Sequence, residues 1–251
     1  MNKSSVAIIT GAASGIGRDT AIAFSGKGVR VTVSDVQEEK LQETAQLIEE
    51  KGGEVLTVRA DVSNEEDVKS LVTETADRFG RIDYLCNNAG VSGELNSTAD
   101  YTVEEWDKVI NVNLRGQWLC MKYAIPVMLS NGGGAIVNVT SILGSVGFEN
   151  APAYVAAKHG LEGLTKTASI EYSAKGIRVN SVAPGFIETP MLDKAGITTD
   201  PETKQSIVSL HPIGRLGKPN EIADAIVWLC SEEASFITGH SMLADGGYTS
   251  R

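Results

Sequence analysis

Short runs of β-branched and other apolar residues alternate with longer segments of helical periodicity along almost the whole chain. The runs predict strands at Val6–Thr10, Arg30–Ser34, Val55–Arg59, Ile82–Cys86, Ala135–Thr140, Arg178–Val182 and Ser241–Ala244. The periodic segments predict helices at Gly15–Gly26, Gln37–Lys51, Asn64–Phe79, Val103–Leu129, Pro152–Ala174 and Pro219–Cys230. The strand runs are nearly continuous in Val, Ile and Leu, which is typical of a parallel sheet covered on both faces. The pattern therefore predicts a doubly wound α/β fold with a parallel seven-stranded sheet and helices on both faces.

The alternation continues without a break in composition, so we expect a single domain over residues 1–251. The longest irregular stretch runs from Pro184 to about Pro201 and is rich in Gly, Thr and Pro. In a compact domain a segment of this kind is usually a lid or a binding loop. We therefore expect a substrate lid at about residues 187–210.

Charge and composition restrict the class of protein. The 22 Lys and Arg residues against 32 Asp and Glu leave a net charge of −10, which argues against a nucleic-acid or anionic-membrane partner. The longest apolar run, from Tyr123 to Leu129, is far shorter than the ~20 residues of a membrane span. Cys86, Cys120 and Cys230 lie far apart with no ligand spacing, so neither disulfides nor a metal site are expected. A cytoplasmic protein is the expectation.

The first predicted strand leads directly into a glycine-rich loop, Gly11-Ala12-Ala13-Ser14-Gly15-Ile16-Gly17, and a helix follows. Glycines let the backbone approach a pyrophosphate, and the helix N-terminus supplies free amides. The spacing differs from the commoner Gly-x-Gly-x-x-Gly, and the alternative interpretation is a purely structural turn. Its place between the first strand and the first helix favours nucleotide binding, so the predicted domain is Rossmann-type.

Asp35 ends the second predicted strand, where an acid binds the adenosine ribose 2′-OH and repels a 2′-phosphate. Ser14 puts no cation in the loop, and Arg18 is the one nearby base. We therefore expect NAD(H), with NADP(H) as the less favoured cofactor. The alternative role for Asp35 is to cap the helix that follows. Asp61, after the third strand, is expected either to contact the adenine amino group or to cap the next helix.

Tyr154 and Lys158 stand four residues apart in a predicted helix, so their side chains share one face. A free phenol has a pKa of ~10 and is scarcely ionised at neutral pH. A nearby ammonium and a positive nicotinamide ring would lower the pKa of Tyr154. It could then act as a base toward an alcohol or as an acid toward a ketone. Such a pair is common on surfaces, so the inference depends on its context.

Two further polar residues supply that context. Ser141 follows the Ala135–Thr140 strand, and ligands gather at the carboxyl ends of parallel strands. Its hydroxyl is expected to hold the substrate oxygen beside the phenol, and the alternative is an ordinary turn residue. Asn113 lies in an otherwise apolar helical stripe. A buried amide there is either a hydrogen-bond hub or the holder of an ordered water.

Jointly, in order and spacing, these residues resemble the motifs of the short-chain dehydrogenase/reductase family: Gly11, Gly15, Gly17, Asp35, Asn87-Asn88-Ala89-Gly90, Asn113, Ser141, Tyr154 and Lys158. The resemblance extends from about Val6 to Tyr248 and is to the short, single-domain branch of the family. It implies an NAD(P)-dependent oxidoreductase that acts on CH–OH groups and assembles as a homotetramer.

The resemblance also implies the roles of the site residues. Tyr154 would be the catalytic acid/base, and Lys158 would lower its pKa while binding the nicotinamide ribose. Ser141 would orient the substrate oxygen, and Asn113 would hold a water that links Lys158 to solvent. The expected cofactor-binding residues are Gly11, Ser14, Gly15, Ile16, Gly17, Asp35, Asp61, Val62, Asn88, Gly90, Tyr154, Lys158, Pro184, Gly185, Ile187 and Thr189.

The predicted reaction is hydride transfer between NAD(H) and a secondary alcohol or its ketone. Apolar walls that suit a cyclic or bulky skeleton are expected from Leu143, Phe148, Phe186, Met191 and Leu192. Glu94 and Glu149 are expected to flank the mouth and to disfavour carboxylate substrates. One alternative is an NADPH-dependent 3-oxoacyl-carrier-protein reductase, against which Asp35 counts. Another is a nucleotide-binding sensor without turnover, against which the presence of both Tyr154 and Lys158 counts.

Overall fold

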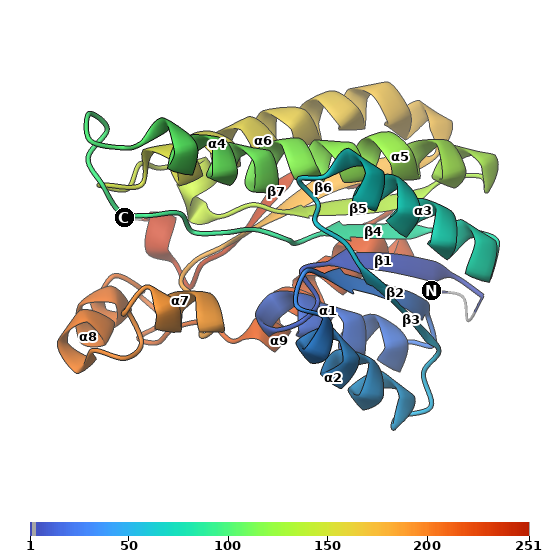
Figure 1. Ribbon diagram of the computed structural model, residues 1–251, viewed down its shortest axis with the longest axis horizontal. Coiled ribbons are helices and arrows are strands. Elements are labelled where there is room, and N and C mark those ends of the chain that lie inside the picture. The colour runs from blue at the N-terminus through green and yellow to red at the C-terminus, as the bar shows by residue number, and fades with distance from the viewer. Residues whose placement is uncertain (2–3, 251) are drawn as a thin grey trace.

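In the computed structural model, which describes residues 1 and 4–250, seven parallel strands form one sheet in the order β3-β2-β1-β4-β5-β6-β7 (Figure 1). The strands are β1 (Val6–Thr10), β2 (Arg30–Asp35), β3 (Val55–Arg59), β4 (Tyr84–Asn87), β5 (Gly134–Val139), β6 (Ile177–Pro184) and β7 (Ser241–Ala244). The order reverses between β1 and β4, the position where doubly wound sheets bind ligands. The predicted doubly wound Rossmann-type fold is confirmed.

Helices cover both faces of the sheet (Figure 1). One face carries α1 (Gly15–Gly26), α2 (Glu38–Glu49) and α9 (Pro219–Cys230). The other carries α3 (Glu65–Phe79), α4 (Val103–Ile110), α5 (Gln117–Ser130) and α6 (Pro152–Tyr172). The buried side chains form one cluster around Phe24 and Ile226 and another around Leu71 and Leu119. Because both faces are covered, all five residues of β1 are buried, which explains its unbroken apolar run.

The prediction of one regular helix over Val103–Leu129 is wrong. A π-helical turn, η1 (Asn111–Gly116), separates α4 from α5. A π turn uses i→i+5 hydrogen bonds and therefore carries an extra residue, which a 3.6-residue hydrophobic pattern does not reveal. The turn contains Asn113, one of the four residues expected to be catalytic.

The stretch from Pro184 to about Pro201, predicted to be irregular, is partly helical. It contains α7 (Pro190–Lys194), and α8 (Pro201–Ser209) follows. Both helices begin with proline at the first turn, where its missing N–H costs nothing. An isolated β-bridge between Ile187 and Gly217 anchors the start of this segment. We call residues 187–210 the arm; its two helices project from one end of the sheet (Figure 1).

The three cysteines are buried and free, as expected of small apolar side chains. Burial raises the pKa of Cys120 and of Cys230 to about 12.

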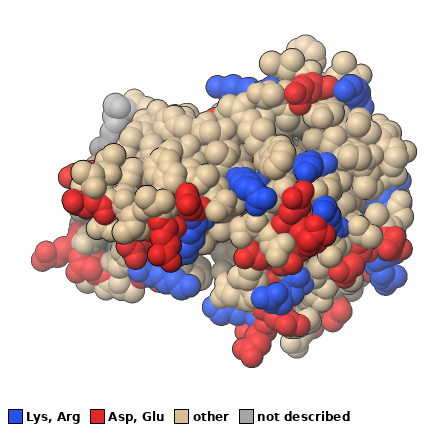
Figure 2. Space-filling view, turned by 45° about the horizontal axis from the view of Figure 1, so that its top comes forward, with Lys and Arg blue, Asp and Glu red and all other residues tan. Residues whose placement is uncertain are grey.

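Within the described chain no group of His, Cys, Asp and Glu is arranged to hold a metal ion. None of the helices in residues 1 and 4–250 combines the length and the apolar character that a membrane crossing requires. Acidic and basic side chains are interspersed on the face shown in Figure 2.

Candidate active site

The glycine loop between β1 and α1 packs directly against the end of β4. Gly11 has a φ of +67°, and a Cβ on Gly17 would lie 2.2 Å from the Gly11 carbonyl oxygen. The Asn88 side chain holds the loop in place, because its Nδ2 donates to the carbonyl oxygens of Thr10 (2.9 Å) and Gly11 (3.1 Å). A side chain at Gly11 or Gly17 would collide with neighbouring backbone, so this tight turn requires glycine at both positions. The turn leads into the N-terminus of α1, whose free amides suit the pyrophosphate of a dinucleotide.

Asp35 joins the end of β2 to the same loop. Its Oδ2 accepts a hydrogen bond from Ala13 N (3.2 Å), and its Oδ1 accepts one from Gln37 N (3.0 Å). The N-cap of α2 is Gln37, so Asp35 does not have the alternative capping role. Arg18 is already paired: it donates to the Ala13 carbonyl oxygen (2.6 Å) and forms an ion pair with Glu43 (3.0 Å). Asp35 and Arg18 therefore both contact the loop at Ala13, and the charge of Arg18 is paired with Glu43.

Asp61 follows β3 and folds back on its own turn. Its Oδ1 accepts hydrogen bonds from the backbone N and the hydroxyl of Ser63 (2.9 and 2.7 Å). The N-cap of α3 is Asn64, whose side chain accepts from Glu66 N, so the alternative capping role belongs to Asn64. The adenine contact of Asp61 stays a prediction. So does the cofactor contact of Val62, a buried residue that packs on the π-helical turn.

Asn113 is fully buried in the π-helical turn. Its Oδ1 accepts from Val91 N (2.8 Å), and its Nδ2 donates to the Val91 carbonyl oxygen (2.7 Å). These two bonds fix the loop after β4 against the turn. Of the two roles inferred from the sequence, the contacts describe the hydrogen-bond hub, and the water-holding role stays a prediction.

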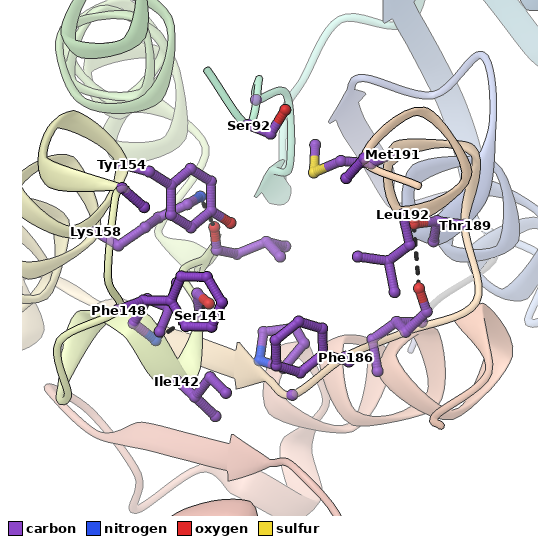
Figure 3. A pocket seen from close by; sticks show the side chains of 18 of the residues that line it. Ser92, Ser141, Ile142, Phe148, Tyr154, Lys158, Phe186, Thr189, Met191 and Leu192 are labelled. Atoms are coloured by element: carbon purple, nitrogen blue, oxygen red, sulfur yellow. Dashed lines mark hydrogen bonds between the residues drawn. The ribbon is translucent and has the colours of Figure 1, made fainter. Parts of the chain in front are cut away.

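α6 places Tyr154 and Lys158 on one face, with Lys158 Nζ 5.5 Å from the centroid of the Tyr154 ring (Figure 3). Lys158 is only 3% exposed, and its Nζ donates to the Val139 carbonyl oxygen at the end of β5 (2.8 Å). Burial lowers the pKa of Lys158 to about 8, against the opposing attraction of Glu162 one helical turn further on. The ammonium group therefore lies close to the Tyr154 ring, and its burial there costs solvation free energy.

Ser141 follows β5 and begins the short 3₁₀ helix η2 (Ile142–Gly144), where its Oγ accepts from Leu143 N (3.2 Å). Burial raises the pKa of Tyr154, and a hydrogen bond with Ser141 acts in the opposite direction. In the chain by itself burial outweighs the hydrogen bond, and the lowered pKa of Tyr154 expected with a bound cofactor stays a prediction. The positive ring invoked for that expectation belongs to the cofactor and not to the chain.

These groups open into a cavity of about 410 Å³ beside the carboxyl ends of β5 and β6 (Figure 3). The expected site residues that line it are Ile16, Asn88, Gly90, Ser141, Tyr154, Lys158, Pro184, Gly185, Ile187 and Thr189. Those that lie outside its lining are Gly11, Ser14, Gly15, Gly17, Asp35, Asp61, Val62 and Asn113. The first group surrounds the reacting end of the site, and most of the second lies along the strand ends and the glycine loop.

The five residues expected to form apolar walls all line the cavity: Leu143, Phe148, Phe186, Met191 and Leu192. Met191 and Leu192 of α7 lie across the cavity from Tyr154 (Figure 3). A hydrogen bond fixes the backbone of Phe186, because its N donates to Nε2 of the buried His211 (3.3 Å). The arm therefore forms one wall of the site.

The expected position of Glu94 and Glu149 at the mouth of the cavity stays a prediction. Neither Glu94 nor Glu149 lines it, and no other Asp or Glu of the described residues does. Lining residues that the sequence reasoning missed include Ser92, Leu95 and Lys194. A signal for Lys194 was present, because it follows Met191 by three residues and so lies on the same side of α7.

A family model described as enoyl-(acyl carrier protein) reductase matches residues 11–249. Cyclohexanol dehydrogenase from Acinetobacter sp. (strain SE19) is 46% identical over 246 residues, which cover 98% of this chain and 95% of that protein. Cis-4-hydroxycyclohexanecarboxylate dehydrogenase from Sinomonas cyclohexanicum is 43% identical over 244 residues, covering 97% and 96%. The crystal structure of a levodione reductase superimposes with a TM-score of 0.95 at 39% identity, covering 98% of both chains.

Proposed function

The chain belongs to the short-chain dehydrogenase/reductase family, and we propose that it interconverts a cyclic secondary alcohol and its ketone with NAD(H). The relatives described above oxidise or reduce secondary alcohols and ketones. The observation that carries the proposal is the cavity, where Tyr154 and Ser141 face apolar walls formed by Phe186, which follows β6, and by α7. Two relatives, cyclohexanol dehydrogenase and cis-4-hydroxycyclohexanecarboxylate dehydrogenase, act on six-membered rings by their names and support such a substrate.

Each polar group of the chain has a distinct role in this proposal. The bound dinucleotide supplies the hydride acceptor or donor. Ser141 orients the substrate oxygen, and Tyr154 exchanges a proton with that oxygen. Lys158, fixed by the Val139 carbonyl, holds a positive charge under the phenol and favours its ionised form. Asn113 keeps the loop after β4 in register with the site through Val91.

The preference for NAD(H) is argued from Asp35. Its carboxylate lies on the glycine loop, and Arg18 is committed to Glu43 and the Ala13 carbonyl. We expect Asp35→Ala to lower the preference for NAD over NADP about tenfold or more, the worth of a charged hydrogen bond. Glu39→Ala removes an exposed acid from the start of α2 and should change nothing. A wild type that prefers NADP would overturn the assignment and favour the carrier-protein reductase.

The substrate proposal is tested by turnover, followed at the nicotinamide absorbance. Cyclohexanol and cyclohexanone are compared with 2-hexanol and 2-hexanone, which have the same number of carbon atoms. We expect a higher kcat/KM for the ring compounds, because the apolar walls Phe148, Phe186 and Met191 surround a compact cavity. A preference for the linear pair would contradict the proposed substrate class.

We also propose a cytoplasmic homotetramer of single-domain subunits, in which the arm is the substrate lid. Trp106 on α4 and Trp118 on α5 are 38% and 42% exposed, which leaves apolar surface for another copy. The buried free thiols suit a reducing compartment. Light scattering coupled to gel filtration should give four times the chain mass of 26.6 kDa, and a monomer would contradict the assembly.

A further inference from the structure

The charged side chains that line the cavity are both cationic. Among the described residues these are Lys158, beneath the tyrosine, and Lys194, the last residue of α7; no carboxylate lines the cavity. Lys194 follows Met191 by one helical turn, so it lies on the side of α7 that forms the cavity wall. The wall faces Tyr154 across the cavity (Figure 3).

Lys194 is the uncommitted cation of the arm. The other arm lysine, Lys204, forms an ion pair with Glu188 (3.1 Å). Asp193 stands next to Lys194 in the sequence, but its carboxylate accepts a hydrogen bond from the Thr198 hydroxyl. Within the described part of the chain, Lys194 has neither a hydrogen bond nor an ion pair. Its ammonium is therefore free to bind a ligand.

The surroundings of Lys194 indicate which part of a ligand it would meet. Ala195 and Ile197, which follow Lys194 on the arm, also line the cavity, and neither offers a competing polar side chain. A substrate whose oxygen lies between Ser141 and Tyr154 would place its carbon skeleton against the α7 wall. Its far end would then reach the turn of α7 that carries Lys194.

We propose that Lys194 binds a carboxylate on the end of the substrate remote from the reacting carbon, so that the enzyme favours cyclic hydroxy acids and keto acids over their neutral counterparts. This inference rests on the proposed function, because it requires the reacting oxygen to lie beside Tyr154. It reverses the sequence-based expectation that acidic side chains at the mouth disfavour carboxylates. A lysine ammonium, with three donors on a flexible stem, can follow carboxylates on rings of different substitution.

The expected effect is moderate. Lys194 is exposed, and an exposed ion pair is worth at most a factor of about five in binding. The net charge of −10 repels anions at long range, so the preference must come from this local contact. Screening of the contact predicts that added salt reduces the preference.

The test compares a charged and a neutral substrate built on the same ring, 4-oxocyclohexanecarboxylate and its methyl ester, each reduced with NADH. We expect the wild type to have the higher kcat/KM for the acid. Lys194→Gln should reduce the acid-to-ester ratio about three- to fivefold, and Lys194→Glu about tenfold, through the KM of the acid. Lys204→Gln is the matched control on the same arm; it lies outside the cavity lining and should leave the ratio unchanged.

Three results would overturn the inference. A wild type that prefers the ester removes its basis while leaving the proposed function intact. If Lys194→Gln lowers turnover of acid and ester equally, or weakens NADH binding in a fluorescence titration, the lysine serves the arm or the dinucleotide instead. A wild type that reduces neither ketone would remove the proposed function and the inference together.

Discussion

Replacing Lys158 by methionine is expected to end turnover and yet stabilise the protein at neutral pH. The side chain is 3% exposed, and burial lowers its pKa from an ordinary 10.5 to about 8. A difference of 2.5 units corresponds to ~3 kcal/mol of unfavourable free energy in the folded state below pH 8. Methionine would leave the Val139 carbonyl oxygen without this donor, which costs the variant about 2 kcal/mol. The net gain for Lys158→Met at pH 7 is therefore about 1 kcal/mol.

The sign of the pH dependence follows from proton counting. Between pH 8 and 10.5 the unfolded chain holds the Lys158 proton and the folded protein has released it, so stability rises with pH. This group adds up to ~3 kcal/mol to the free energy of unfolding of the wild type across that window. The Lys158→Met variant lacks the titrating group, so the order of stability should reverse at high pH.

The assay is urea unfolding of both proteins at pH 7, 8, 9 and 10, with the difference in free energy plotted against pH. Other titrating groups are common to both proteins and cancel in the difference. Lys166→Met, an exposed position two turns further along α6, is the control and should give a flat difference. A flat difference for Lys158→Met as well would refute the reasoning.

Tyr154→Phe keeps the ring and should lower turnover about 10²–10⁴-fold with unchanged NADH affinity; full activity would exclude the phenol as the acid/base. Gly17→Ala forces a Cβ to 2.2 Å from the Gly11 carbonyl oxygen and should weaken dinucleotide binding and lower the melting temperature. Gly163→Ala, whose Cβ would meet nothing within 4 Å in α6, should instead stabilise by up to about 1 kcal/mol. Asn138→Leu leaves the buried Asn87 amide without its 2.9 Å partner and should cost about 2 kcal/mol in urea unfolding. A thiol reagent should label no cysteine in the native protein and all three after denaturation, because burial raises the pKa of each.

Features that depend on neighbouring residues were predictable from the sequence. The sheet follows from unbroken apolar runs, and the glycine loop from its place after β1. The apolar walls, including Phe148 and Met191, were also identified correctly. Apolar side chains near strand ends and in the arm lie beside the site, so they are buried by lining it. Asp35 was placed at the end of β2, but its bond to Ala13 depends on a loop that the strand pattern does not describe.

The features that could not be predicted depend on distant contacts. The π-helical turn is fixed by bonds between Asn113 and Val91, which are 22 residues apart, and the helical pattern carries no trace of them. Glu94 lies in an irregular loop between β4 and α4. The sequence pattern therefore does not predict whether its carboxylate points into the cavity. The pKa of Tyr154 depends on how deeply the fold buries the phenol, which periodicity does not quantify.

The extra residue in the π-helical turn lets one nearly continuous helical rod serve two neighbours. Each residue of an α-helix advances its direction by about 100°, so one inserted residue rotates everything beyond it by that angle. Before the turn, Val109 points into the cluster beneath α6, and after it Leu119 points into the core of the sheet. Deleting one residue between 111 and 116 would restore a regular α-helix. Val109 and Leu119 could then no longer both point into their clusters. The loop carrying Val91 would then lose its hydrogen bonds to Asn113. Because this loop borders the cavity, deletion of one residue in the turn would change the shape of the cavity.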